Sequence, residues 1–278
     1  MMMIRYEIGI VETRNVIKTI LDTYGYDFSD YALTSLKRRL EDVIINNGLK
    51  DADGLIYRLQ NNKDYFDHFL REITSETTEM FRDPSLWRSL REEIIPDIVR
   101  GSGKLKIWIG SFDSGEDLYS LCITLKEMNL LGEATIFTSV ISDTVTKKIQ
   151  SGRIDMKQIE TNEANYTRYN GAKQYSNYVT QTGTIASFDT TLINDVSFLK
   201  QNPFFNNAPG GIKLLLFRNQ MIYFNQVLQD KVLNTISNSL VPGGYLVLGA
   251  KETLENTNSS NKFTVVNDGE KIYKKKTG

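Results

Sequence analysis

LLLFRNQMIYF, residues 214–224, is the stretch that decides the fold of this chain. It begins with an apolar run, residues 214–217, which lacks alternation and so is typical of a strand buried on both faces in the parallel sheet of an α/β domain. Ligands of such sheets bind just beyond the carboxyl ends of the strands. Arg218 and Asn219 follow the run at once, and Tyr223 comes shortly after them. The stretch therefore predicts a binding site that includes these three polar side chains.

The bulk composition limits the classes of function that are open. The chain has 278 residues, of which 40% are hydrophobic and 24% charged, and these values are ordinary for a globular protein with one large domain or two smaller ones. Its net charge of −1 argues against a nucleic-acid partner, because proteins that neutralise phosphates normally carry a basic excess. Cys122 is the only cysteine and His68 the only histidine, so we expect no disulfide and no metal site built on either residue type.

The sequence also bears on localisation. It contains no apolar run of membrane-spanning length, and its first residues, MMMIRYEIG, lack the basic-then-apolar order of a signal peptide. We therefore expect a cytoplasmic chain without membrane insertion.

The N-terminal part predicts short helices without strands. Across residues 14–72 apolar residues recur at three- and four-residue spacing, as in Leu33, Leu36 and Leu40, while charged residues occupy the other face. This pattern predicts an all-helical N-terminal domain over residues 1–80.

From about residue 100 the pattern changes to that of an α/β domain. KLKIWIGS (104–111) and ATIFTSVIS (134–142) predict strands, each followed by a helix, and successive strand–helix units predict parallel pairing. Residues 243–250 predict a further strand, and FTVVNDGEKIYKKK (263–276) predicts a hairpin. A parallel sheet that ends in an antiparallel hairpin is the shape of the Rossmann-like methyltransferase fold, which we assign to residues 81–278. Within it, residues 155–185 are polar and rich in Tyr and Asn, and they predict a small inserted β-hairpin or irregular subdomain.

Two further segments carry candidate site residues. GSFDSGEDLYS (110–120) joins a strand to a helix through glycines that let a ligand approach the backbone, but it lacks the G-x-G-x-x-G spacing of dinucleotide sites. Its acids, Glu116 and Asp117, suit a cationic ligand; on this turn alone, a role in stabilising the helix N-terminus is the more common one. TSETTEMFRDPSLW (74–87) places Arg82 between the two predicted domains, where clefts form.

Taken together, four pieces resemble the CheR-type chemoreceptor glutamate methyltransferases: TEMFRD (78–83), GEDLYS (115–120), FRNQMIYF (217–224) and PGGYLVLGAKE (242–252). The run YGYDFSDYALTSLKRRLEDVIINNGLKDADGLIYRL (24–59) is similar to that family's helical domain, so the resemblance covers nearly the whole chain. It implies a Rossmann-like S-adenosylmethionine methyltransferase fold with an all-helical N-terminal domain and a small inserted β-subdomain. It also implies methyl transfer from S-adenosylmethionine to glutamate side chains on the cytoplasmic helices of chemoreceptors, which yields S-adenosylhomocysteine.

The resemblance also implies roles for individual residues. Thr78 and Arg82 would hold the methionine end of the cofactor, since the guanidinium fork suits a carboxylate. Glu116 would face the cationic amino or sulfonium end, Asn219 would lie beside the transferred methyl, and Tyr223 would lie near the acceptor carboxylate. The complete set implied for the cofactor is Thr78, Arg82, Gly110, Glu116, Ile141, Asp189, Arg218 and Asn219, and the catalytic pair is Arg82 and Tyr223. No metal and no general base is required, because the protein mainly positions an ionised glutamate against an activated methyl group.

Some positions depart from the family's pattern. Val140 stands where the family has an acid for the ribose hydroxyls, and losing such an acceptor costs ~1.5–3 kcal/mol, or about ten- to a hundredfold in affinity. Ser142 and Asp143 are the nearest substitutes. Glu76, Leu118, Asp189 and Ala250 are further departures. These substitutions favour the alternative reading, a methyltransferase-like scaffold or regulatory protein whose cofactor binding is impaired.

The resemblance suggests two surfaces for a partner. The family docks onto receptors with the subdomain that corresponds to residues 155–185, which could equally be a solvated hairpin here. The basic cluster Lys37-Arg38-Arg39 would face acidic receptor helices, although a solvated helix face is the more common meaning of such a cluster.

Overall fold

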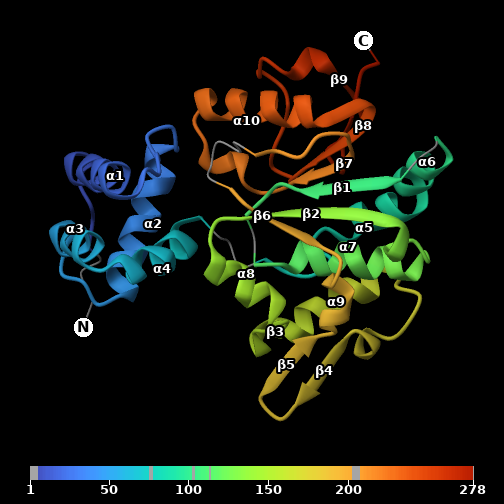
Figure 1. Cartoon of the computed structure of the whole chain (residues 1–278), viewed down its shortest axis with the longest axis horizontal. Helices are drawn as coiled ribbons and strands as arrows, with labels where there is room; N and C mark the ends of the chain where they lie inside the picture. The colour runs from blue at the N-terminus through green and yellow to red at the C-terminus, as the bar shows by residue number, and fades with distance from the viewer. Residues whose placement is uncertain (1–5, 75–77, 102–103, 113, 202–206, 278) are drawn as a thin grey trace.

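The computed structural model describes residues 6–74, 78–101, 104–112, 114–201 and 207–277. The predicted N-terminal helices are present, and they lie together at one end of the molecule (Figure 1). Their bounds are α1 (Ile10–Tyr24), α2 (Leu33–Asn46), α3 (Ala52–Asn61) and α4 (Lys63–Thr74).

Local sequence explains where these helices begin and end. The Gly9 N–H donates to the Glu12 carboxylate at 2.6 Å at the start of α1, and Gly25, with φ 73°, ends that helix in the left-handed conformation. The Asp51 side chain accepts from the Gly54 N–H at 3.0 Å and so caps α3. The leucines at three- and four-residue spacing point inward: Leu36 and Leu40 of α2 are fully buried.

The main sheet has the order β6-β2-β1-β7-β8-β10-β9. Its strands are β1 (Leu105–Ile109), β2 (Ala134–Val140), β6 (Ser197–Lys200), β7 (Ile212–Phe217), β8 (Leu240–Leu248), β9 (Phe263–Asn267) and β10 (Ile272–Lys275). The pairs β6·β2, β2·β1, β1·β7 and β7·β8 are parallel, and β10 pairs antiparallel with both β8 and β9. The predicted fold class is therefore confirmed, and β7 occupies the centre of the sheet with residues 214–217 completely buried.

Helices cover both faces of this sheet. In Figure 1, α10 (Gln226–Ser239) lies above the sheet, and α7 (Glu116–Glu127) and α8 (Asp143–Gln150) lie below it. The segment before β1 forms α5 (Pro84–Ser89), a π-helical turn (Leu90–Ile94) and α6 (Ile95–Arg100). Residues 116–125 of α7 are all buried, so this helix belongs to the core rather than to the surface.

The insert contains more structure than the sequence indicated. It forms a three-stranded antiparallel sheet, ordered β3-β5-β4, with β3 (Arg153–Ile154), β4 (Val179–Thr182) and β5 (Ile185–Phe188). The predicted hairpin is the β4·β5 pair. Helix α9 (Ile159–Tyr169) was not predicted, because its buried positions include Asn162 and Asn165 and so show no apolar periodicity.

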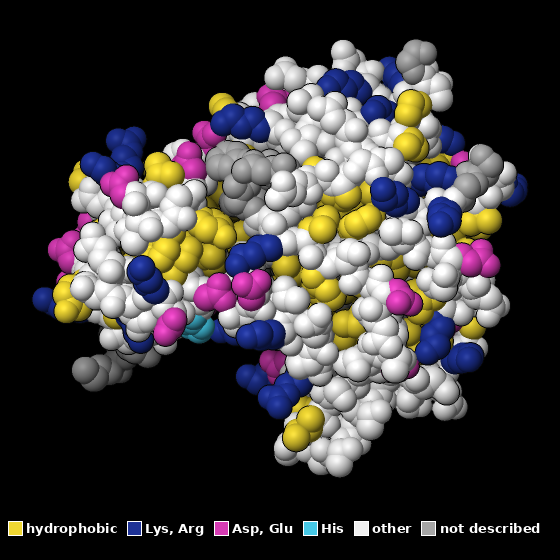
Figure 2. Space-filling model, viewed as in Figure 1, with side chains coloured by type: hydrophobic (Ala, Val, Ile, Leu, Met, Phe, Trp, Pro, Cys, Tyr) yellow, Lys and Arg dark blue, Asp and Glu magenta, His cyan; other side chains and the backbone are white. Residues whose placement is uncertain are grey.

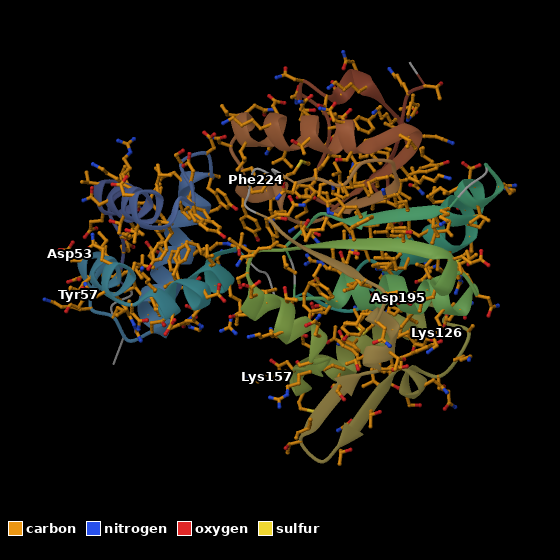
Figure 3. All side chains as sticks on the ribbon, viewed as in Figure 1. Asp53, Tyr57, Lys126, Lys157, Asp195 and Phe224 are labelled. Atoms are coloured by element: carbon orange, nitrogen blue, oxygen red, sulfur yellow. The ribbon has the colours of Figure 1, made fainter. Side chains whose placement is uncertain are left out.

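Backbone hydrogen bonds connect the helical domain to the segment that directly follows β7. The Ala32 N–H donates to the Tyr223 carbonyl at 2.8 Å, and the Asn225 N–H donates to the Asp30 carbonyl at 2.9 Å. Figure 3 shows Phe224 at this junction, whereas Asp53 and Tyr57 lie on the outer side of the helical domain. Figure 2 shows acidic and basic side chains interspersed between the helical domain and the rest of the molecule. A further contact joins α4 to α8, where Asp67 accepts from Thr144.

No helix in the described part of the chain is long and apolar enough to cross a membrane.

Candidate active site

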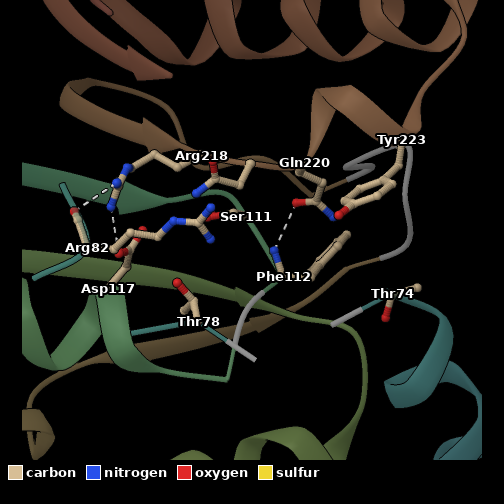
Figure 4. A pocket seen from close by; sticks show the side chains of 10 residues that line it. Thr74, Thr78, Arg82, Ser111, Phe112, Asp117, Arg218, Gln220 and Tyr223 are labelled. Carbon is tan, nitrogen blue, oxygen red and sulfur yellow. Dashed lines mark hydrogen bonds and ion pairs between the residues drawn. The ribbon is translucent and has the colours of Figure 1, made fainter. Parts of the chain in front are cut away.

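A hollow opens at the carboxyl ends of β1 and β7, where α/β sheets bind ligands (Figure 4). It brings together five of the predicted site residues, which come from two segments that are far apart in the sequence: Thr78, Arg82, Arg218, Asn219 and Tyr223. The other residues that line it are Thr74, Ser111, Phe112, Asp117 and Gln220.

The segment that carries Thr78 and Arg82 is held in an unusual backbone conformation. Phe81 has φ 49° and Asp83 has φ 59°, both in the left-handed region that non-glycine residues rarely adopt. Buried side chains hold the segment in place: Asn162 of α9 accepts from the Met80 N–H at 3.0 Å, and Ser120 of α7 accepts from the Phe81 N–H at 2.9 Å. The polar buried face of α9 is therefore explained by the backbone groups that it binds.

Arg218, at the end of β7, connects the segment that carries Thr78 and Arg82 to the main sheet. Its guanidinium donates to Asp117 at 2.8 Å, to Asp83 at 2.6 Å and to the Arg82 carbonyl at 3.0 Å, and its side chain is 1% exposed. Burial raises the pKa of Asp117, and the Arg218 guanidinium opposes that rise. Because both carboxylates already pair with Arg218, its positive charge is neutralised within the protein. Sequence reasoning missed Asp83 and Asp117 as its partners, since their pairing depends on three distant segments.

Arg82 differs from Arg218 in this respect. Its carbonyl accepts from Arg218 and from the Trp87 indole, but its guanidinium makes no ion pair or hydrogen bond with the described residues. It lines the hollow together with the largely buried Thr78. A guanidinium without an ion-pair partner in the described part of the chain suits an anionic ligand such as a carboxylate.

The turn after β7 is organised by a buried acid. Glu252 accepts from the backbone N–H groups of Asn219 at 2.9 Å, Met221 at 2.6 Å and Gly249 at 2.7 Å. Asn219 has φ 57°, and a Cβ added at Gly249 would lie 2.4 Å from its Oδ1. Glu252 belongs to PGGYLVLGAKE, where sequence reasoning assigned it no role. Gln220 was also missed, and its Oε1 accepts from the Phe112 N–H at 2.9 Å, which connects this turn to the one after β1.

Tyr223 contacts Arg39, a member of the basic cluster of α2. The Arg39 guanidinium lies 4.0 Å from the centre of the Tyr223 ring and also donates to the Ile73 carbonyl at 2.6 Å. Arg39 is half-buried, so within Lys37-Arg38-Arg39 it is a junction residue rather than part of a solvated face. The charge of the helical domain thus reaches the edge of the hollow at Tyr223.

Glu116 and Gly110 lie at the turn after β1. Glu116 is 8% exposed and accepts from the Ser114 hydroxyl at 2.6 Å, and burial raises its pKa to about 7. The Gly110 N–H donates to the Leu216 carbonyl at 2.8 Å, and a Cβ at Gly110 would lie 3.2 Å from the Phe217 ring. Neither residue lines the hollow, although Glu116 directly precedes Asp117, which does. A cationic ligand would stabilise the ionised form of such a buried acid more than it would stabilise an exposed acid in the first turn of a helix.

The carboxyl end of β2 has no acidic side chain at the position where the resemblance implies one. Val140 and Ile141 are buried, and the Val140 carbonyl accepts from the Gln201 N–H at 2.9 Å. Both candidate substitutes have other partners: the Ser142 hydroxyl caps α8 by accepting from the Val145 N–H, and Asp143 pairs with Lys200 at 2.9 Å. Glu76, another departure, lies outside the described residues.

Asp189, predicted as a cofactor residue, does not line the hollow. Its carboxylate accepts from the Thr191 N–H and hydroxyl and pairs with Lys126 at 3.3 Å. The neighbouring Phe188 stacks on Tyr119 of α7 at 4.2 Å between ring centres, so Asp189 lies beside that helix, and it is not among the residues that line the hollow. Asp189 follows β5, a strand of the small sheet, whereas the main-sheet strand before β7 is β6, which Gln201 follows. Asn202, the next residue, lies outside the described part of the chain.

The chemistry of the hollow fits a zwitterionic ligand. Among the described residues, Arg82 offers a cation without an ion-pair partner, and the buried Ser111 hydroxyl has no hydrogen-bond partner. Glu116 does not line the hollow, but it lies in the turn beside it and offers a buried acid for an ammonium or sulfonium. The methionine end of S-adenosylmethionine carries these two kinds of charge. The residues present therefore fit that cofactor at its amino-acid end, while the ribose edge at Val140 lacks its expected acid.

Comparisons with known proteins agree with this geometry. Residues 76–271 match the family model "CheR methyltransferase, SAM binding domain", and residues 12–74 match "CheR methyltransferase, all-alpha domain". A Pseudomonas putida protein named Cher3 is 30% identical over 265 residues, which cover 95% of this chain and 97% of that protein. The chemotaxis protein methyltransferase of Listeria monocytogenes is 23% identical, with 84% of this chain and 86% of the relative covered. The chemotaxis protein methyltransferase 1 of Pseudomonas aeruginosa is 25% identical, with 78% and 81% covered.

Proposed function

The chain belongs to the CheR methyltransferase family, and we propose from this membership that it methylates glutamate side chains of chemoreceptors with S-adenosylmethionine. The observation that carries the proposal is an Arg82 guanidinium that has no ion-pair partner among the described residues and lines a hollow at the carboxyl ends of β1 and β7. The names of the relatives, chemotaxis protein methyltransferases, support a role in chemotaxis.

We assign the following roles to the residues of this chain. When bound, the cofactor supplies a methyl group already activated by its sulfonium. Arg82 and Thr78 bind its carboxylate, and Glu116 pairs with its cationic groups. Asn219, fixed by Glu252, and Tyr223 line the side of the hollow where the acceptor enters. Positioning two reactants in line is sufficient for this reaction, so none of these residues need remove a proton.

The proposed acceptor is a glutamate on the cytoplasmic helices of a chemoreceptor, and the protein would act in the cytoplasm. Arg39 supports a carboxylate acceptor, because it extends the positive charge of α2 to Tyr223 at the edge of the hollow. A carboxylate that approaches along α2 would therefore meet a favourable field before it reaches the hollow.

Cofactor affinity is expected to depend on pH through Glu116. Because burial raises the pKa of Glu116 to about 7, the side chain is largely neutral at pH 6 and largely ionised at pH 8. Only the ionised form pairs with an ammonium, so the affinity for S-adenosylhomocysteine should rise about tenfold from pH 6 to pH 8 and level off above that. Calorimetric titration across this range measures the rise. The Glu116→Gln variant should bind weakly with a flat profile, and a variant that retained the wild-type slope would show that another group titrates.

Titration of the protein with S-adenosylhomocysteine distinguishes the enzyme from a scaffold with impaired cofactor binding. The wild-type protein is expected to bind in the micromolar range, and Arg82→Ala to weaken binding by about 30- to 100-fold, because the ligand carboxylate loses a charged partner. Arg100→Ala is the matched control, since that side chain is 77% exposed and lies on α6. Absence of heat with wild-type protein at millimolar ligand would overturn the proposed function and favour the scaffold.

A further inference from the structure

Ser111 is a buried polar residue in the hollow to which nothing above assigns a role. It follows Gly110 at the end of β1, is 3% exposed and lines the hollow. Its hydroxyl has no hydrogen-bond partner among the described residues, and neither has the buried Nε–H of Arg218 in the same hollow. Buried polar groups are nearly always paired, so two unpaired groups in one hollow point to a ligand that completes them.

The neighbours of Ser111 indicate the charge of that ligand. The acids at this end of the hollow, Asp83 and Asp117, are both engaged by Arg218. Three groups near these acids can donate and have no hydrogen-bond acceptor among the described residues: the Arg82 guanidinium, the Arg218 Nε–H and the Ser111 hydroxyl. A set of donors around an unpaired cation suits an anion with two acceptor oxygens, and a carboxylate is such an anion.

The position of Ser111 indicates which carboxylate it binds. Figure 4 shows the Tyr223 side chain at the opposite end of the hollow from Arg82 and Ser111. Tyr223 is also the residue that contacts Arg39 of the helical domain, from which we expect the acceptor glutamate to approach. Ser111 therefore lies on the cofactor side of the hollow rather than on the acceptor side.

We propose that Ser111 is a cofactor-binding residue whose hydroxyl donates a hydrogen bond to the methionine carboxylate of S-adenosylmethionine, which it shares with Arg82. The proposal rests on the proposed function and adds a second group to that subsite. A second hydrogen-bonding group at the methionine carboxylate would also compensate for the missing acid at position 140. More of the binding free energy would then come from the amino-acid end of the cofactor than from its ribose.

The test compares two ligands on one variant. Calorimetry with S-adenosylhomocysteine should show about tenfold weaker binding by Ser111→Ala, as expected for a lost hydrogen bond to a charged group. Binding of 5′-methylthioadenosine, which lacks the amino-acid end, should be unchanged. The melting temperature of the ligand-free variant should be equal to that of the wild type or higher, because the change removes an unpaired buried hydroxyl.

Ser139→Ala is the matched control. This serine of β2 is also buried, but its hydroxyl accepts from the Trp108 indole N–H at 2.9 Å. The control should therefore lose melting temperature and keep its affinity for S-adenosylhomocysteine, which is the opposite of the result expected for Ser111→Ala.

The outcomes separate this inference from the proposed function. If the wild-type protein does not bind S-adenosylhomocysteine, both are overturned. If it binds and Ser111→Ala binds equally well, only the role of Ser111 is overturned. If the variant loses affinity for both ligands to the same extent, the hydroxyl does not contact the carboxylate, and the inference is again overturned while the proposed function stands.

Discussion

Replacing Arg218 with alanine is expected to lower the free energy of unfolding by about 3–5 kcal/mol, because the change leaves a buried carboxylate without its partner. Asp117 has a side-chain exposure of 5% and pairs with Arg218 at 2.8 Å. Loss of the guanidinium also frees Asp83 and the Arg82 carbonyl, which hold the left-handed segment at the hollow. Urea unfolding of the ligand-free protein measures the change.

Two further variants make the Arg218 prediction specific. Lys271→Ala removes one partner of a pair with Asp268, whose side chain is 77% exposed, and should change the free energy of unfolding by less than about 1 kcal/mol. The double variant Arg218→Ala with Asp117→Ala should be less destabilised than the sum of the single changes, since the two residues share one interaction. A loss below about 1 kcal/mol for Arg218→Ala would contradict a buried ion pair as the tie between these segments.

Replacing Glu252 with alanine is expected to destabilise the fold by about 3 kcal/mol or more, since it leaves two buried N–H groups and one part-buried N–H group without an acceptor. These groups belong to Asn219, Met221 and Gly249, so the turn that presents Asn219 and Tyr223 to the hollow should also loosen. We expect methyl transfer to fall with it, mainly in kcat, because the acceptor side loses its fixed geometry. Denaturant unfolding and transfer of labelled methyl groups measure the two effects.

A graded pair of variants tests the mechanism at Glu252. Glu252→Gln retains one acceptor oxygen but turns an amide N–H₂ toward a backbone donor, so its loss of stability should lie between zero and that of Glu252→Ala. Glu255→Ala is the control, because Glu255 is exposed in the loop beyond β8. Equal and small losses of stability in Glu252→Ala and Glu252→Gln would show that the hydrogen bonds from Glu252 do not stabilise the turn.

Most of the α/β core could be predicted because its pattern is local. The apolar run at residues 214–217 is a strand at the centre of the sheet, and the hairpin around Asn267-Asp268-Gly269 is present as β9 and β10. Helix α9 could not be predicted in this way, because the face that it buries is made of Asn and Tyr side chains that bind another segment's backbone. The sequence likewise did not show that Asp189 follows a strand of the small sheet, since a short strand there has the same local pattern as one in the main sheet.

The candidate site shows where sequence reasoning reaches its limit. Arg82 and Arg218 are both arginines beside motif residues, and the sequence does not tell which one carries a free charge. The structure distinguishes them, because Arg218 pairs with Asp83 and Asp117 while Arg82 has no such partner among the described residues. Glu252 and Ser111 were not singled out either, since the role of each depends on groups that the chain brings to it from other strands.

By itself the sequence determined the fold class, with its helical domain, and the family, and it predicted a site where the strand of residues 214–217 ends. These follow from hydrophobic periodicity and from the order of the motifs, which can be identified directly in the sequence. Only the tertiary structure decided which charges in that site are neutralised, which acid holds the turn at Asn219, and which buried hydroxyl has no partner. The physical reason is that hydrogen bonds and ion pairs in this site join segments more than thirty residues apart, and a residue's local sequence does not determine its distant neighbours.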